Sequence, residues 1–459
     1  MNPTSTVSFP ADFIWGASSA SYQIEGAAEE DGKGLSVCDV FYRQPQNAWE
    51  GDNGDVACDH YHRWESDLDL MKQIGLHAYR FSISWPRVIP TGSGAVNKAG
   101  LDFYDRLVDG LLARGIQPMC CLFHWDFPYD LHLRGGWLNR EVADWFADYA
   151  KVIAGRLGDR VSSWVTMNEP QVVIMGGHRS GVHAPGLRLP LCDQVRAAHH
   201  MLLSHGRALQ ALRAGCKLPV KAGAAPVGVV RFPATESPAD IEAARAGTFD
   251  ITEDTFWNNT WYADPMVFGH YPEDGMKFWG AHLPAGWEND LADIRQPLDF
   301  YGANIYNGQR VQALADGSCA PARGDVGPRL TSMDWKVTPE SLYWGPRFFH
   351  ERYKLPVLIT ENGMANNDWV QSDGRVRDPQ RIDFTHRYLT QLARAVGDGV
   401  PVLGYMHWTW CDNFEWHFGY SRRFGLVHID YETQARTPKD SAKWYAELIR
   451  GGCLPPLEI

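Results

Sequence analysis

The chain has 459 residues, 44% hydrophobic, 21% charged and 12% aromatic, so it can bury a large core and is not a disordered protein. Its 43 basic and 55 acidic residues give a net charge of -12, which repels phosphate backbones and anionic membranes and argues against nucleic acid as a partner. Nineteen Trp residues are many for such a chain, and exposed Trp rings are suited to stacking on sugars or other flat ligands.

Short apolar or β-branched runs recur along the chain, and each ends in a polar or aromatic cluster. Such runs predict strands. In chain order the eight expected strands cover residues 13–17, 77–83, 117–123, 163–167, 220–230, 298–305, 356–360 and 402–407. Stretches typical of helices lie between them, at residues 65–74, 100–114, 140–157, 195–214, 379–396 and 440–450.

Strict alternation of strands and helices predicts an α/β fold with a parallel sheet, and eight units favour a closed (β/α)8 TIM barrel over an open doubly wound sheet. No G-x-G-x-x-G or G-x-x-x-x-G-K-[ST] motif follows a strand, which weighs against the open nucleotide-binding fold. We expect residues 1–459 to form a single barrel catalytic domain. Because a minimal barrel needs only about 250 residues, long βα loops should wall a deep active-site pocket.

Two carboxylates directly follow apolar strands. Glu169 ends the run Trp164-Val165-Thr166-Met167-Asn168-Glu169, and Glu361 ends Val357-Leu358-Ile359-Thr360-Glu361. An isolated Glu at such a place more often forms a salt bridge or caps a helix. Strands four and seven lie across a barrel mouth from one another, however, and a pair of Glu residues flanking one pocket is what glycosidic bond cleavage requires.

Four motifs make the pattern specific: residues 13–26 (FIWGASSASYQIEG), 166–170 (TMNEP), 359–363 (ITENG) and 412–416 (DNFEW). Together, and in this order, they resemble the hallmark motifs of glycoside hydrolase family 1, the β-glucosidase family. The resemblance covers the chain from about residue 9 to about residue 450. It implies a β-glucosidase that hydrolyses terminal non-reducing β-D-glucosyl residues, with β-galactosides and β-fucosides as further candidate substrates.

The resemblance also implies a retaining mechanism with Glu361 as nucleophile and Glu169 as general acid/base. Retention requires the two carboxyls about 5 to 5.5 Å apart, close enough for the ionised Glu361 to keep Glu169 protonated. When Glu361 becomes a neutral ester, the pKa of Glu169 should fall, so that Glu169 can accept a proton from water. The reaction needs no metal or cofactor, and we expect none.

Supporting residues follow from the same resemblance. Arg80 and Tyr306 should keep the nucleophile ionised, Asn304 should steady the acid/base, and Asn168 should hydrogen-bond the sugar 2-hydroxyl. The residues expected to bind the glycone are Gln23, His124, Trp125, Asn168, Trp408, Glu415, Trp416 and Phe424. Alone, a His or Trp at these positions would more often belong to the core. Because several of them end predicted strands, we place them in the barrel mouth.

The aglycone side is less well determined by the sequence. Its candidate residues are Val172, His183 and Trp335, the last resembling a family Trp that stacks on the leaving group. Departures from the family pattern, such as His178 where Tyr is common, also concern this side. Transglycosylation, in which an alcohol instead of water captures the covalent intermediate, is an alternative outcome at this side of the site.

Two alternatives remain from the residues alone. Glu415 would repel a 6-phosphate on the sugar, yet Arg422 and Arg423 nearby keep a 6-phospho-β-glycosidase under consideration. A non-catalytic sugar-binding barrel is the third hypothesis, because fold alone does not dictate function, but its usual sign would be loss of one Glu.

The location and partners are expectations from composition. The residues before Pro10 lack a basic n-region and an apolar h-region, and no run of 18 apolar residues occurs, so we expect a cytoplasmic protein. The nine Cys form no C-x-x-C motif, and the 17 His show no H-E-x-x-H pattern, so no zinc site is expected. The expected partner is a small-molecule β-glucoside or cello-oligosaccharide, with no membrane; a homo-oligomer is compatible with the sequence.

Overall fold

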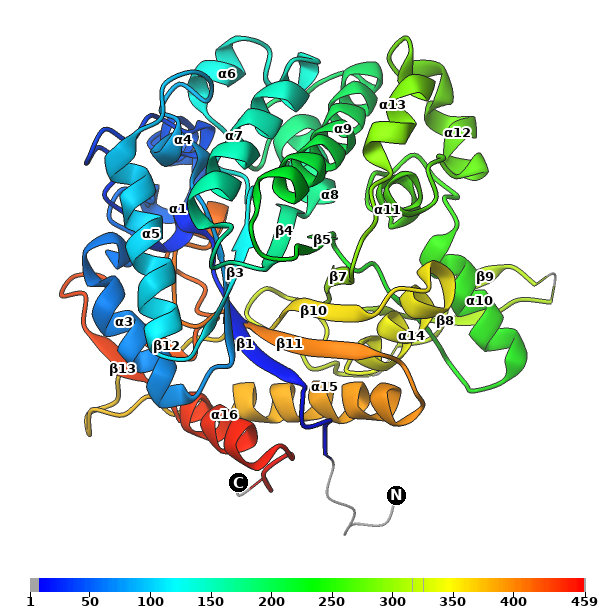
Figure 1. The fold of residues 1–459 in the computed structure, drawn as a ribbon. Helices are drawn as coiled ribbons and strands as arrows, with labels where there is room; N and C mark the ends of the chain where they lie inside the picture. The colour runs from blue at the N-terminus through cyan, green and yellow to red at the C-terminus, as the bar shows by residue number, and fades with distance from the viewer. Residues whose placement is uncertain (1–7, 316, 325, 458–459) are drawn as a thin grey trace.

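The chain forms a barrel of eight parallel strands surrounded by helices, as the alternating pattern predicts (Figure 1). The computed structural model describes residues 8–315, 317–324 and 326–457. The hydrogen-bonded strand order is β5-β4-β3-β2-β1-β11-β10-β7. These strands are β1 (Ile14–Ser18), β2 (Ala78–Ser82), β3 (Gln117–Cys121), β4 (Ser163–Asn168), β5 (Lys221–Ala225), β7 (Tyr301–Asn304), β10 (Val357–Asn362) and β11 (Val402–Trp408).

Backbone hydrogen bonds close the barrel between its two outermost strands, β5 and β7. Asp299 N donates to Ala222 O over 2.8 Å, Asn304 N to Pro226 O over 3.1 Å, and Gly228 N to Asn304 O over 2.8 Å. Closure leaves no sheet edge there, and it brings the carboxyl ends of all eight strands to one face.

Side chains fill the inside of the barrel in two zones, an apolar cluster below and polar residues at the carboxyl ends of the strands. Ala78, Met119, Val165, Leu358 and Met406 belong to one buried apolar cluster between the strands. Because strand residues two apart share a face, the positions that follow this cluster toward the carboxyl ends also point inward. The apolar cluster therefore forms the floor beneath the polar residues of the barrel mouth.

Amphipathic helices cover the outside of the sheet. In α5, the buried Leu101, Tyr104, Leu107, Val108 and Leu111 lie at the three- and four-residue spacing of a helix face. The covering helices are α3 (His60–Ile74), α5 (Lys98–Ala113), α7 (Val142–Leu157), α9 (Leu191–Gly215), α14 (Ser341–Tyr353), α15 (Pro379–Gly397) and α16 (Asp440–Gly451). The six predicted helices are present, and the largest shift of a boundary is at α3, which begins at His60 instead of Glu65.

The helix α14 was not predicted from the sequence. It contains Gly345 and Pro346, both of which disfavour a helix interior, so the local signal is weak. Packing against β7, β10 and α15 stabilises it instead. Tertiary contacts have thus overridden the local preference.

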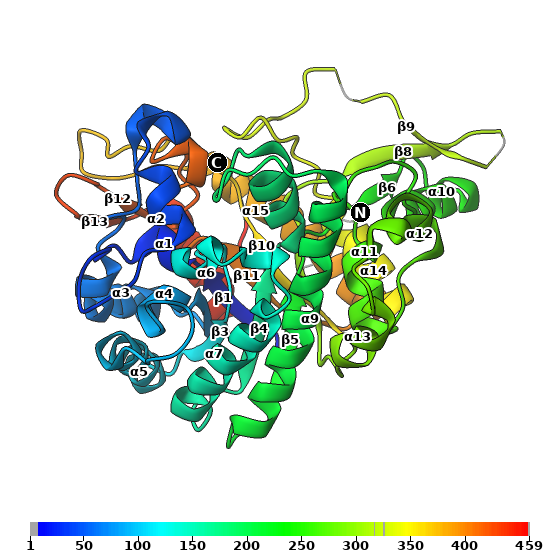
Figure 2. The same cartoon turned by 90° about the horizontal axis from the view of Figure 1, so that it is seen from above.

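The remaining elements lie in the loops between strands and helices. Figure 2 shows β6, β8 and β9 beside α10, and they form a separate three-stranded sheet. The strands among these elements are β6 (Arg231–Pro233), β8 (Gln309–Ala313), β9 (Cys319–Pro321), β12 (Val427–Ile429) and β13 (Arg436–Pro438). The helices are α1 (Ser21–Ile24), α2 (Val37–Tyr42), α4 (Trp85–Val88), α6 (Tyr129–Leu133), α8 (Pro170–Val172), η4 (Val173–Ser180), α10 (Pro238–Phe249), α11 (Thr260–Val267), α12 (Glu273–Trp279) and α13 (Trp287–Ile294), with short 3-10 turns η1 (Pro45–Asn47), η2 (Trp49–Gly51), η3 (Gly136–Leu138), η5 (Gly280–His282) and η6 (Trp416–Phe418). Within the described ranges, no helix is long and apolar enough to cross a membrane.

Candidate active site

The two predicted glutamates lie in the barrel mouth. Glu361 is part of β10, and Glu169 directly follows β4 with a left-handed backbone (φ 44°) that turns the chain into α8. Both are buried, with 3% and 8% of their surface exposed. Both line a cavity of about 660 Å³, which is large enough for a sugar and part of its aglycone.

The Glu361 carboxylate is held by a cation and a phenol. Arg80 Nη1 on β2 donates to Glu361 Oε1 over 2.5 Å, and the Tyr306 hydroxyl donates to Glu361 Oε2 over 2.7 Å. Burial raises the pKa of Glu361, and these two donors act in the opposite direction. Of the two glutamates, Glu361 is therefore the one whose ionised form the protein favours.

Glu169 has a different environment. Asn304 Nδ2 donates to Glu169 Oε1 over 2.8 Å and to Asn168 Oδ1 over 3.0 Å, and Asn304 Oδ1 accepts from Thr360 over 2.6 Å. Burial, followed by the charge of Glu361, raises the pKa of Glu169 to about 8. The surroundings thus favour the protonated form of Glu169 at neutral pH, while Arg80 and Tyr306 favour the ionised form of Glu361 against the effect of burial, the contrast that an acid and a nucleophile require.

A second polar group lies at the end of the cavity formed by β1 and the loop after β11. Gln23 Nε2 donates to Phe414 O over 2.8 Å and approaches Glu415 Oε2 at 3.4 Å. Burial, then the charge of Glu361, raises the pKa of Glu415 to about 8. Gln23 Oε1 is buried, and no described residue is its partner, so it is an acceptor left for a ligand.

His124 is enclosed by indole rings. Its ring is stacked with those of Trp408 and Trp416, with centroids 5.7 and 6.1 Å away. Burial lowers its pKa well below the usual range, so the ring is neutral at pH 7. Asn168 Nδ2 donates to His124 Nε2 over 3.1 Å, which leaves the proton on Nδ1. That buried nitrogen has no hydrogen-bond partner among the described residues and is a donor available to a hydroxyl.

A buried ionic network holds the loop that carries Glu415, Trp416 and Phe424. Asp412 accepts from Lys439 Nζ over 2.6 Å, from Arg423 Nη1 over 2.9 Å and from Gly425 N over 2.9 Å. The two arginines of this loop do not line the cavity: Arg423 is occupied by Asp412, and the guanidinium of Arg422 lies over the Phe418 ring at 4.8 Å.

All the predicted site residues gather around this one cavity. Gln23, Arg80 and Asn168 adjoin the cavity and are hydrogen-bonded to residues that line it. The predicted residues that line it directly are Glu169, Glu361, Asn304, Tyr306, His124, Trp125, Trp408, Glu415, Trp416, Phe424, Val172, His183 and Trp335.

Several lining residues were missed from the sequence, among them Met175, Val182, Val227, Val229, Trp257 and Met333. Val227 and Val229 belong to the apolar run 220–230, which was predicted as a strand in full. The strand β5 ends at Ala225, so the rest of the run forms cavity wall. The position of that run at a strand end was the available signal, because such positions face the barrel mouth.

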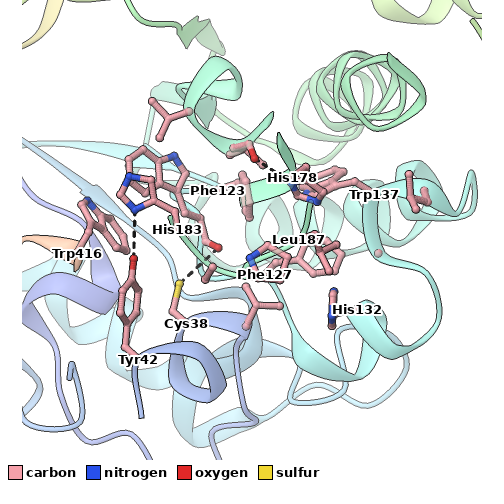
Figure 3. Close-up of a pocket in the computed structure, with 18 of the residues that line it drawn as sticks. Cys38, Tyr42, Phe123, Phe127, His132, Trp137, His178, His183, Leu187 and Trp416 are labelled. Carbon is pink, nitrogen blue, oxygen red and sulfur yellow. Dashed lines mark hydrogen bonds between the residues drawn. The ribbon is translucent and has the colours of Figure 1, made fainter. Parts of the chain in front are cut away.

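Figure 3 shows residues that line a second cavity, which has a volume of about 150 Å³. Part of its wall is common to the active-site cavity. It shares Trp125, Val172, His183 and Trp416 with the active-site cavity. The Tyr42 hydroxyl is 3.3 Å from His183 Nδ1 and steadies this wall. His178 lines the second cavity and not the first, so this departure from the family pattern lies outside the active-site cavity.

Comparison with known proteins assigns the chain to a family. The model of glycosyl hydrolase family 1 matches residues 5–452. Beta-glucosidase A of Thermotoga maritima is 44% identical, over 97% of this chain and 98% of that protein, and 1,4-beta-D-glucan glucohydrolase of Thermotoga neapolitana is 43% identical, over 97% and 99%. The family 1 β-glucosidase of Thermotoga maritima in complex with isofagomine lactam superposes with a TM-score of 0.89 at 43% identity, over 98% of this chain and 100% of that one. The chain belongs to glycosyl hydrolase family 1.

Proposed function

We propose that this chain hydrolyses terminal, non-reducing β-D-glucosyl residues with retention, using Glu361 as nucleophile and Glu169 as general acid/base. The observation that carries this assignment is the contrast between the two buried carboxyls. Arg80 and Tyr306 donate hydrogen bonds to Glu361, whereas the donor to the Glu169 carboxyl among the described residues is the neutral amide of Asn304. This contrast separates the protonation states of the pair in the way that a double displacement requires.

In the first step Glu361 attacks the anomeric carbon, while Glu169 gives its proton to the departing oxygen. The bond to the aglycone breaks, and Glu361 becomes a neutral ester. Because the charge that raised the pKa of Glu169 has gone, that pKa falls and Glu169 accepts a proton from water. The water oxygen then attacks the same carbon from the face the aglycone left, which releases the sugar with retained configuration and restores Glu361.

The glycone is placed by the end of the cavity that holds Glu415. We assign Gln23, Glu415 and His124 to the sugar hydroxyls, because Gln23 Oε1 and His124 Nδ1 have no partner among the described residues. Trp408, Trp416, Trp125 and Phe424 supply apolar surface for the ring. Asn168, fixed by Arg80 and Asn304, is assigned to the 2-hydroxyl.

The substrate is an unphosphorylated β-glucoside. Glu415 lines the glycone end, while Arg422 and Arg423 lie outside the cavity lining, so no cation among the described residues at that end favours a 6-phosphate. The relatives named β-glucosidase and 1,4-β-D-glucan glucohydrolase support glucosides and cello-oligosaccharides as substrates. A bifunctional β-D-glucosidase/β-D-fucosidase, 41% identical, supports testing fucosides as well. We infer one catalytic domain over residues 1–459.

The test is a matched pair of variants rescued by azide. Glu361→Gly should lose hydrolysis, and azide should restore release of an activated phenol from 2,4-dinitrophenyl β-D-glucoside as the α-glucosyl azide. Glu169→Ala should form the glucosyl-enzyme from the same substrate, and azide should then give the β-glucosyl azide. Exchanged configurations of the two azides would refute the assigned roles, and no rescue of either variant would refute double displacement at this pair.

A further inference from the structure

The outer part of the active-site cavity has a valine wall. Val227, Val229 and Val230 follow β5 and line the cavity beyond the catalytic pair, together with Val172 and Val182. Val227 and Val229 are only partly buried, so they have surface that an aglycone can cover.

The backbone N–H and C=O groups of Val227 and Val229 are hydrogen-bonded to amide side chains behind this wall. Gln171 Oε1 accepts from Val227 N over 3.2 Å, and Gln171 Nε2 donates to Val227 O over 3.4 Å. Asn259 pairs with Val229 in the same way, through Oδ1 with Val229 N at 3.1 Å and Nδ2 with Val229 O at 2.8 Å. Both amide side chains are fully buried. The wall therefore presents methyl groups and little else.

Flat and soft apolar groups complete this compartment. Trp257 lines the cavity and has 44% of its surface exposed, so an aglycone in this compartment can cover apolar surface of its ring. Trp335 is packed at 5.2 Å from the Tyr306 ring, so its position is fixed. Met175 and Met333, whose flexible thioethers adapt to ring edges, also line the cavity.

Polar groups are distributed unevenly along the described lining. Its three carboxyl side chains, Glu169, Glu361 and Glu415, all belong to the catalytic pair or the glycone end. Asn307, Gln309, Ser180 and Arg231 also contribute to the lining and can serve a polar substituent. They do not change the apolar character of the valine wall itself.

We propose that this compartment selects β-glucosides whose aglycone carries an aromatic ring over those whose aglycone is a second glucose. A glucose against the valine wall would exchange hydroxyl–water hydrogen bonds for methyl contacts, which costs free energy. An aromatic ring would instead remove apolar surface of the wall and of Trp257 from water. The proposal rests on the proposed function, since it concerns the aglycone side of that same site.

Three substrates separate binding from leaving-group chemistry. 2-Phenylethyl and ethyl β-D-glucosides both release a primary alcohol, and the sugar hydroxyl released from cellobiose is the better leaving group. We expect kcat/KM for the phenylethyl glucoside to exceed that for each of the others at least about tenfold, as for other apolar pockets that discriminate by size. A higher kcat/KM for cellobiose than for the phenylethyl glucoside would overturn the proposal.

Two variants locate the effect. Trp257→Ala should lower kcat/KM for the phenylethyl glucoside by a larger factor than it lowers kcat/KM for the ethyl glucoside. Val229→Thr, which is isosteric but adds a hydroxyl, should reduce the preference for phenylethyl glucoside over cellobiose by roughly fivefold. Val326→Thr, at a position 90% exposed and away from the cavity lining, is the control and should change nothing.

All these glucosides form the same glucosyl-enzyme intermediate. The rate at which it is hydrolysed therefore distinguishes a change in the aglycone compartment from general damage to the active site. With 2,4-dinitrophenyl β-D-glucoside, kcat reports hydrolysis of the intermediate after the aglycone has left, so in Trp257→Ala and Val229→Thr this kcat should fall by a smaller factor than kcat/KM for the phenylethyl glucoside. An equal or larger loss of that kcat in both variants would overturn the assignment to the aglycone compartment. Failure of the proposed function would look different: no hydrolysis of any glucoside by the wild-type protein and no labelling of Glu361 by a 2-deoxy-2-fluoroglucoside.

Discussion

Replacing Arg80 by Met tests the electrostatic basis of the catalytic pair. Arg80 is fully buried, and its Nη1 is 2.5 Å from Glu361 Oε1, so the variant leaves a buried carboxyl without its cation. With the charge centres about 4 Å apart and an effective dielectric constant of about 20, the lost attraction is about 4 kcal/mol, or about 3 pKa units. The hydrogen bond from Tyr306 remains, so we expect the pKa of Glu361 to rise by about 2 to 3 units.

The sign of the kinetic effect follows from the role of nucleophile that we propose for Glu361. The nucleophile must be ionised, so its pKa sets the acid limb of the profile of kcat/KM against pH. Raising that pKa moves the acid limb to higher pH. The charge of Arg80 also lowers the pKa of Glu169, so the basic limb should move in the same direction but less, because Arg80 bonds Glu361 directly.

The assay is kcat/KM for p-nitrophenyl β-D-glucoside from pH 4 to 10, with folding checked by circular dichroism. Arg87→Met is the matched control, because Arg87 is equally buried and is paired with Glu25 at 2.9 Å outside the active-site cavity. It should lose stability to a similar extent and keep the wild-type acid limb. A folded Arg80→Met protein whose acid limb has not moved would refute the reasoning.

Two further predictions concern stability. Lys439→Met removes the buried partner of Asp368 and Asp412, each 2.6 Å away, so it should lower the free energy of unfolding by about 3 to 5 kcal/mol, measured by urea denaturation; an equal loss in Lys443→Met, whose side chain is 59% exposed, would contradict this. Burial lowers the pKa of His407 to about 3, below its unfolded value of about 6.5, so the unfolded chain binds the extra proton and stability falls as pH decreases through that window. His407→Phe should therefore weaken the loss of stability between pH 6.5 and 3, and an unchanged slope of stability against pH would contradict the assignment.

The architecture could be predicted because patterns of neighbouring hydrophobic and polar residues indicate its strands and helices. Alternating apolar runs and amphipathic stretches gave the eight barrel strands, and α14 was missed because Gly345 and Pro346 remove its local signal. Glu169 and Glu361 were found for a related reason: in a parallel barrel, the residues that follow each strand meet at one face whatever the loops contain.

The cavity wall beyond the catalytic pair was less accessible to sequence reasoning. The sequence predicts Val227 and Val229 as part of a strand. In the structure, their backbone N–H groups instead donate to the side-chain amides of Gln171 and Asn259, which are distant in sequence. The same holds for Trp257, whose exposure becomes informative only once it is known to face the cavity.

By itself, the sequence determined the order of strands and helices, the positions of the two carboxylates and the resemblance that gives them roles. The tertiary structure alone decided which contacts separate the protonation states of the two carboxyls, which polar atoms are left for a ligand and where the cavity becomes apolar. The physical reason is that hydrophobic periodicity acts over a few residues, whereas pKa values and hydrogen-bond satisfaction depend on neighbours brought together by folding, such as Arg80 and Glu361, 281 positions apart.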